Sequence, residues 1–190
     1  MSSNYTVVFD ANVLYPAPLR SFLMYLAVSG EFRARWTEMI HDEWIRNLLK
    51  KRTDLTAEQL HQTRTLMNEN VPGSVVTGFE GLIESITLQD ENDRHVVAAA
   101  IQTRAEAIIT FNLKDFPSSE LSKYGIIALH PDEFIANLIN LNSGTVIEAA
   151  RRQRASLKNP SLTTLEFIDL LQKQQLPKTA AFLRKLELII

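Results

Sequence analysis

Short apolar runs separated by longer helical patterns are the feature that most constrains how this chain of 190 residues can fold. The runs at 6–9, 107–111 and 124–129 are typical of buried strands, and 32–36 is typical of a further short strand. The stretches between them carry apolar residues at helical spacing. Strands that alternate with helices predict an α/β fold with a mostly parallel central sheet covered on both faces.

Helix signals between these runs place the remaining elements. A helix is predicted over 19–27, another over 38–50 capped by Thr37, a third over 54–70 with a capping box at 56–59, and a fourth over 90–107. His130-Pro131 starts a further helix. No strand pattern is found between 134 and 187. We therefore expect one α/β domain over 1–144 and a helical C-terminal extension over 145–190, with joints at Gly144 and at 159–161.

Composition excludes several classes of protein. The chain has no cysteine, so disulfides, zinc–thiolate sites and cysteine nucleophiles are excluded. No signal peptide and no membrane-spanning run are found, which favours a cytoplasmic protein. The formal net charge is −2, so a nucleic-acid partner would be contacted locally and not by a strongly basic surface. Two basic clusters are candidates, 50–52 and 151–154, although each is also typical of a solvated helix end or face.

Four carboxylates stand at comparable places in the predicted fold. Asp10 directly follows the buried run 6–9, and Asp115 follows the buried run 107–111. Glu43 lies on the helix after the predicted strand 32–36, and Asp93 opens the helix rich in small residues. Each alone has an ordinary explanation as a turn residue, a helix-start acid or an exposed helix residue. However, the carboxyl ends of parallel strands form one crevice where ligands bind. We therefore expect these acids to converge.

Several carboxylates in one crevice repel one another, which raises their pKa values or requires a cation. Oxygen ligands without cysteine suit Mg²⁺ or Mn²⁺ better than zinc, and such sites often act on phosphate through activated water. Neither a nucleophilic triad nor a glycine-rich phosphate loop is visible. The four histidines show no paired ligand spacing, and His41 and His95 are expected at the surface or behind the acids.

Four stretches resemble the acidic motifs of PIN-domain ribonucleases: 7–14, 40–44, 90–100 and 110–116. They occur in the right order across roughly residues 5–135, and within that family the chain is most similar to the toxin components of VapBC-type toxin–antitoxin pairs. The resemblance implies a three-layer α/β/α domain, a Mg²⁺ or Mn²⁺ site and endonucleolytic cleavage of RNA. The extension after about 145 lies beyond the family's compact pattern.

The resemblance also assigns residues and partners. Asp10, Glu43, Asp93 and Asp115 match the family's catalytic, metal-binding acids, and Asn12 and Asn112 match its polar neighbours. Asp90 is a second candidate beside Asp93, and Asp93 is preferred because it lies one turn before the packed residues 96–97. Members of the family often pair as homodimers and bind a small antitoxin protein, so the resemblance points to these partners and to an RNA substrate, away from membranes.

Two other functions stay open on the residues alone. A phospho-acceptor signalling module also gathers acids at the ends of parallel strands, although no clear acceptor aspartate with a following threonine and lysine is found. A non-catalytic PIN-like binding module, whose acids only cap helices, is the other alternative.

Overall fold

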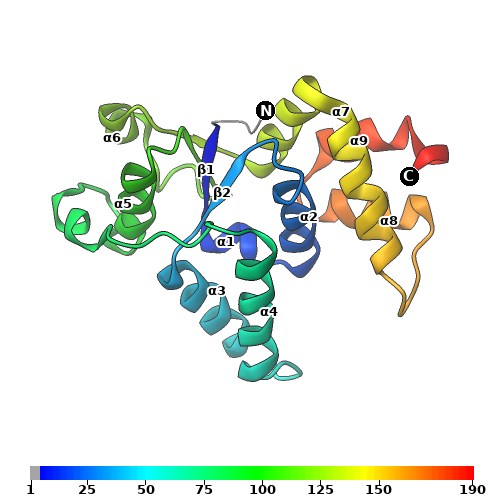
Figure 1. The fold of residues 1–190 in the computed structure, drawn as a ribbon, viewed down its shortest axis with the longest axis horizontal. Coiled ribbons are helices and arrows are strands. Elements are labelled where there is room, and N and C mark those ends of the chain that lie inside the picture. Colours follow the sequence, from blue (N-terminus) through cyan, green and yellow to red (C-terminus); the bar gives the residue numbers. More distant parts are fainter. Residues whose placement is uncertain (1–4) are drawn as a thin grey trace.

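The central sheet has four parallel strands in the order β2-β1-β3-β4. The computed structural model describes residues 5–190, so residues 1–4 lie outside it. The strands are β1 (Thr6–Phe9), β2 (Arg33–Arg35), β3 (Ala107–Ile109) and β4 (Ile127–Leu129). Helices flank the sheet (Figure 1). The predicted α/β class with a parallel sheet is therefore confirmed.

The two central strands are the most deeply buried part of the sheet. Every side chain of β3, and Val7, Val8 and Phe9 of β1, is fully buried. Phe9 stands opposite Ile109 in the register, and the backbone N–H of Asp10 donates to the carbonyl of Ile109 at 3.1 Å. The residues that follow these strands, Asp10 and Thr110, are therefore held side by side at the carboxyl edge.

The prediction that the third strand continues to Phe111 was wrong by two residues. β3 ends at Ile109 because the backbone N–H of Phe111 donates to the side-chain oxygen of Asn12, at 3.0 Å, and not to a neighbouring strand. A one-turn helix, α1 (Ala11–Leu14), was also not predicted. Asp10 caps it, because its Oδ1 accepts a hydrogen bond from the backbone N of Ala11 at 2.6 Å.

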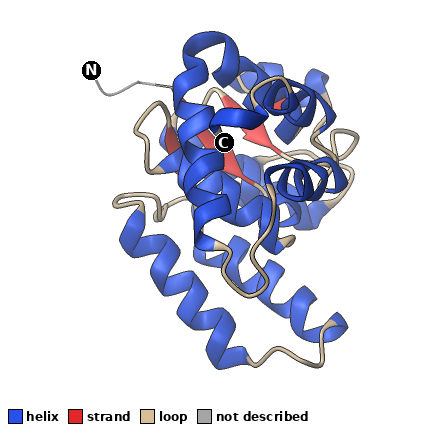
Figure 2. Ribbon diagram, turned by 90° about the vertical axis from the view of Figure 1, so that its right-hand side faces the viewer, coloured by secondary structure: helices blue, strands red, loops and turns tan. Residues whose placement is uncertain are grey.

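Three long helices lie in the first half of the chain, and two of them begin at the caps predicted from the sequence. They are α2 (Ala17–Ala27), α3 (Glu38–Lys51) and α4 (Ala57–Asn70). The hydroxyl of Thr37 accepts from the backbone N of Ile40, and Thr56 and Gln59 form a capping box. α3 and α4 pack side by side as a hairpin that projects from the rest of the molecule (Figures 1 and 2).

The predicted helix over 90–107 is shorter and begins differently. Residues Glu91–Asp93 form a 3₁₀ turn (η2), followed by α5 (Arg94–Thr103), which packs on β1 and β3. The helix ends at Arg104, whose φ of 52° is left-handed. The stretch between α4 and η2, which has no clear sequence period, contains another 3₁₀ segment, η1 (Glu80–Ser85). Short α6 (Ser118–Leu121) and η3 (Ser122–Tyr124) precede β4.

The rest of the chain is helical, as expected. It comprises α7 (Pro131–Ser156), α8 (Thr164–Lys173), α9 (Pro177–Arg184) and η4 (Glu187–Ile189). α7 is interrupted at Asn142, where φ is −154° and ψ is 86°, two residues before the predicted joint at Gly144. The predicted domain boundary at 144/145 thus falls inside α7, just after this kink. α7 packs against α2 and α9, and α8 packs against α9 (Figure 1).

No helix in the described range 5–190 combines the length and the apolar character that a membrane span requires.

Candidate active site

Asp10 lies at the carboxyl edge of the sheet with only 4% of its surface exposed. Its Oδ2 accepts hydrogen bonds from the hydroxyl of Thr110 at 2.7 Å and from Nδ2 of Asn12 at 2.6 Å. Burial raises the pKa of Asp10 to about 6, although the hydrogen bond from Thr110 opposes that shift. A carboxylate oxygen has about two lone pairs, so Oδ2 is fully used and Oδ1, which accepts only from Ala11, keeps one.

Thr110 is the residue of this site to which the sequence interpretation gave no role. Besides donating to Asp10, its hydroxyl oxygen accepts from Nδ2 of Asn12 at 2.9 Å and from the backbone N of Asn112 at 3.0 Å. Its position could have identified it from the sequence. Thr110 directly follows the central strand β3, just as Asp10 directly follows the central strand β1. Thr110 therefore ties both asparagines named from the sequence to Asp10.

Asp93 stands at the junction of η2 and α5 and is partly buried. Its pKa is raised to about 7, first by burial and then by the negative charges of four other acids: Asp10, Asp90, Asp115 and Glu43. All the acids named from the sequence are therefore close enough to act on one carboxyl group.

The two candidates Asp90 and Asp93 differ in their surroundings. Asp90 is exposed, and its Oδ1 accepts from both the backbone N and the side-chain Nδ2 of Asn92 at 2.9 Å, which caps the 3₁₀ turn. Asp115 is partly buried in the loop after β3, where its backbone N donates to the carbonyl of Asn112 at 3.0 Å. Asp93 thus faces the other acids, whereas Asp90 is engaged locally.

His41 and His95 were expected at the surface or behind the acids, and both are buried, so the surface alternative is excluded. Nε2 of His95 lies 3.6 Å from Oε2 of Glu43, and its Nδ1 has no hydrogen-bond partner among residues 5–190. A charge on His95 lowers the pKa of Asp10. His41 instead joins α3 to α4, because it contacts Asn68 and accepts from Trp44, each at 3.0 Å.

The donor set fits a hard divalent cation in its chemistry. The carboxylates offer oxygen ligands, and burial together with neighbouring negative charges raises the pKa values of Asp10 and Asp93. Within residues 5–190, however, no three acid or histidine side chains are already close enough to enclose an ion. Direct contact of one ion with three of these side chains would require the carboxylates to draw together.

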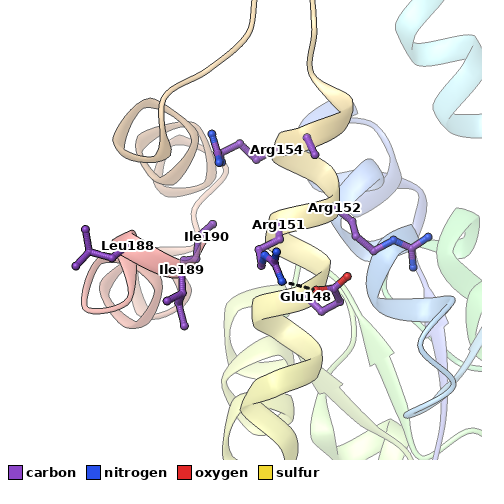
Figure 3. A pocket seen from close by; sticks show the side chains of 8 residues that line it. Glu148, Arg151, Arg152, Arg154, Leu188, Ile189 and Ile190 are labelled. Atoms are coloured by element: carbon purple, nitrogen blue, oxygen red, sulfur yellow. Dashed lines mark hydrogen bonds and ion pairs between the residues drawn. The ribbon is translucent and has the colours of Figure 1, made fainter.

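Two hollows matter for what could bind. One, of about 360 Å³, adjoins the acids and is lined by Ala11, Asn12, Tyr15, Glu43, Asn47, Lys50 and Lys51. A larger one, of about 600 Å³, lies far from them, between α7 and the C-terminal residues 188–190 (Figure 3). The larger hollow contains none of the candidate acids, so size does not identify the site of chemistry here.

Comparison with known proteins gives two family matches that divide the chain. Residues 6–114 match the PIN domain, and residues 131–185 match the VapC50 C-terminal domain. The chain is also 37% identical over 109 residues to a protein of Mycobacterium tuberculosis named "Putative ribonuclease VapC50". That alignment covers 57% of this chain and 63% of the relative. No solved structure matched the chain.

Proposed function

Because this chain belongs to the PIN-domain family, we propose that it is a metal-dependent endoribonuclease and the toxin of a toxin–antitoxin pair. The observation that carries the proposal is the gathering of acids around Asp93, beside the buried Asp10, at the carboxyl edge of a parallel sheet. The similarity to a protein named as a ribonuclease supports the same activity. A module whose acids only cap helices would not need to bury Asp10 among them.

In this proposal, Asp10, Glu43, Asp93 and Asp115 hold Mg²⁺ or Mn²⁺, supported by Asn12, Asp90 and Asn112. When bound, such an ion would supply a Lewis acid for a phosphoryl oxygen and would lower the pKa of a water molecule for attack on phosphorus. The chain's own contribution is orientation. Thr110 and Asn12 fix the Asp10 carboxylate with Oδ1 left as an acceptor, and His95 lies against Glu43 on the buried side.

The proposed partners follow from the toxin role. A small antitoxin protein would bind this chain and hold it inactive, and the chain would act as a homodimer in the cytoplasm, where its RNA substrate is found. The match of residues 131–185 to the C-terminal domain of a VapC protein supports this role. We assign the nuclease unit to 1–144 and the extension to 145–190.

The test is cleavage of RNA by the purified full chain with Mg²⁺ or Mn²⁺, with and without EDTA. We expect cleavage that EDTA stops and that Asp10→Asn and Asp93→Asn abolish. Asp169→Asn is the matched control, because Asp169 is an exposed acid of α8 that pairs with Arg184 at 2.8 Å. Unchanged cleavage in Asp10→Asn, or cleavage that survives EDTA, would contradict the proposal.

The toxin role needs a separate measurement in cells. Expression of the wild-type chain should stop bacterial growth, expression of Asp10→Asn should not, and the small protein from the neighbouring reading frame should restore growth. Growth that the wild-type chain leaves unaffected would separate ribonuclease activity from the toxin role.

A further inference from the structure

The hollow beside the acids continues from them along one face of α3. Glu43 and Asn12 line both the acid cluster and this hollow, and Lys50 and Lys51 line its other end. Glu43, Asn47, Lys50 and Lys51 are spaced by four, seven and eight residues, so they form one stripe on the helix. At 1.5 Å per residue the stripe is about 12 Å long. The stripe runs from the negative charge of Glu43 to the positive charges of Lys50 and Lys51.

We propose that this hollow, which we call the Tyr15 groove (Tyr15, Asn47, Lys50 and Lys51), binds the nucleotide of single-stranded RNA next to the phosphodiester that is cut. Lys50 and Lys51 contact its phosphate, and the ring of Tyr15 packs against its base. The inference rests on the proposed ribonuclease function and names the part of the substrate that this face of the site holds.

The acid cluster makes such a groove necessary. RNA carries a negative charge at each phosphate, and the acids repel it, while the chain as a whole has a formal net charge of −2. Beyond the proposed metal ion, attraction therefore comes from positively charged side chains placed close to the acids. Lys50 and Lys51 are the cations that line the same hollow as Glu43 and Asn12.

The two lysines are free to bind an anion. No carboxylate of the described residues forms an ion pair with either of them, whereas the neighbouring Arg52 is paired with Asp54 at 2.6 Å. The Nζ of Lys51 lies 5.9 Å from the centre of the Tyr15 ring. The groove thus presents a cation beside an aromatic ring, a combination that suits a nucleotide, which is both charged and flat.

Tyr15 is held in place by the chain around it. Its backbone N donates to the carbonyl of Ala11 at 2.9 Å, and its own carbonyl accepts from Nη1 of Arg20 at 3.3 Å. Nη1 of Arg20 also donates to the carbonyl of Leu14 at 2.6 Å. The backbone that carries the ring is thus fixed, which lowers the freedom that the ring can lose when a base packs against it.

The other basic cluster, on α7, is already engaged within the molecule. Arg151 pairs with Glu148 at 3.3 Å, and Nη1 of Arg154 donates to the carbonyl of Leu162 at 3.3 Å. Arg152 lies over the ring of Tyr25, with its guanidinium carbon 5.6 Å from the ring centre. Figure 3 shows these arginines on α7, opposite the C-terminal residues. Their hollow contains none of the candidate acids, so it does not adjoin the site of cleavage.

Lysines in the last turn of a helix also have an ordinary explanation, because they complement the helix dipole. Lys173 is a matched case, since it is an exposed lysine in the last turn of α8 and lines no hollow that contains a candidate acid. A variant with Lys173→Gln and Arg151→Gln removes two positive charges from the extension. It leaves the Tyr15 groove intact, and it therefore measures the effect of overall charge alone.

The experiment measures binding of a fluorescent single-stranded RNA of about 12 nucleotides. Anisotropy is recorded over a range of salt concentrations with the full chain carrying Asp10→Asn, so that the RNA is not cut. In this background, Lys50→Gln with Lys51→Gln should weaken binding at least about tenfold. It should also reduce the slope of log affinity against log salt by about 0.7, the value for one neutralised phosphate on a single strand.

The ring is tested in the same assay. Tyr15→Ala should weaken binding by about 5-fold to 100-fold with little change in the salt slope, whereas Tyr15→Phe should stay within about twofold of the parent. The control Lys173→Gln with Arg151→Gln should leave the slope unchanged. Thermal melting of each variant identifies any that no longer fold as the parent does.

The outcomes separate the groove from the ribonuclease activity. Lysine-dependent binding of an RNA that the wild-type chain does not cut would support the groove and contradict the ribonuclease. Cleavage by the wild-type chain, with affinity and salt slope unchanged in a folded double-lysine variant, would overturn the groove alone. Equal losses in the double-lysine variant and the extension control, or no binding of single-stranded RNA by the parent, would also overturn it.

Discussion

The hydroxyl of Thr179 donates a hydrogen bond of 2.7 Å to the buried carboxylate of Asp132, which joins the first turn of α9 to the first turn of α7. Asp132 also accepts from the backbone N of Thr179 at 2.9 Å and of Lys178 at 2.8 Å. α9 has no side-chain cap of its own, so an acid 45 residues earlier than Pro177 caps it. The helical extension is thereby attached directly after the last strand of the sheet.

Replacing Asp132 with alanine should destabilise the protein by about 3 kcal/mol. The change leaves two backbone N–H groups and a hydroxyl of the α9 start without acceptors in a buried place, and each such loss costs about 1–3 kcal/mol before relaxation. Urea unfolding followed by circular dichroism measures the effect. Glu133→Ala is the control, because Glu133 is exposed and its ion pair with Lys178 should contribute less than about 1 kcal/mol. Equal losses in the two variants would contradict the capping role.

Thr110→Val should lower the rate of RNA cleavage by about 10-fold to 100-fold, the usual cost of removing a group that orients a metal ligand. Valine keeps the shape of threonine but removes the donor to Asp10 and the acceptor for Asn112. Thr103→Val is the matched control, since the hydroxyl of Thr103 bonds only to carbonyls of α5, at 2.8 Å and 3.4 Å. Cleavage rates of both variants are measured under saturating Mg²⁺. A wild-type rate in Thr110→Val would contradict the role of Thr110 in orienting the Asp10 carboxylate.

Asp93→Asn and Asp90→Asn should have very different effects on cleavage. Asp93 faces the other acids, so its loss should lower the rate by more than the 10-fold to 100-fold expected for a group that only orients a ligand. Asp90 is exposed and caps a 3₁₀ turn, so Asp90→Asn should keep most of the activity. Cleavage rates of the two variants, measured in parallel, test the preference for Asp93 as the metal ligand. A larger loss in Asp90→Asn than in Asp93→Asn would make Asp90 the preferred ligand.

The metal-free protein should become less stable as the pH rises from about 4 to about 7. The pKa values of Asp10, about 6, and Asp93, about 7, are raised above the value of about 3.9 for an unfolded aspartate. Between these values the folded state binds more protons than the unfolded state, so the free energy of unfolding falls with rising pH. Urea unfolding in EDTA at several pH values should show this fall.

The same shifts predict the effect of a cation. At pH 7, Mg²⁺ or Mn²⁺ should raise the melting temperature of the wild-type chain, because a bound cation offsets the repulsion between the acids. Asp10→Asn should show a weaker pH dependence and a smaller effect of the cation. A wild-type melting temperature indifferent to millimolar Mg²⁺ would count against a metal site.

Where local chemistry decides the structure, the sequence was sufficient to predict it. Thr37 and Thr56 begin helices because their hydroxyls accept from backbone N–H groups three residues later, which depends on neighbours in the chain alone. The parallel sheet was likewise predicted from the alternation of strand and helix patterns along the sequence. The acids could be named because each follows a strand or starts or lies on a helix.

Contacts between distant residues account for what could not be predicted. Thr110 is buried against Asp10, a hundred positions away, and nothing next to it in the sequence indicates that contact. α1 was missed because four residues are too few to show a helical period. Likewise, His41 and His95 are buried by packing of α3 and α5 against their neighbours, whereas their sequence context is partly polar.

Arg20 shows why one residue type is required behind the groove. It is buried with no carboxylate partner among the described residues, its guanidinium lies 4.6 Å from the centre of the Trp44 ring, and burial lowers its pKa to about 10. A lysine in that position starts from a lower pKa and would shed its proton far more readily, and it lacks the flat fork that reaches two carbonyls while stacking on a ring. Asn12 lies in the one-turn helix α1 and Tyr15 directly follows it, and Arg20 holds the carbonyls at the end of that turn. A substitution of Arg20 should therefore disturb both the proposed catalysis and the proposed RNA binding.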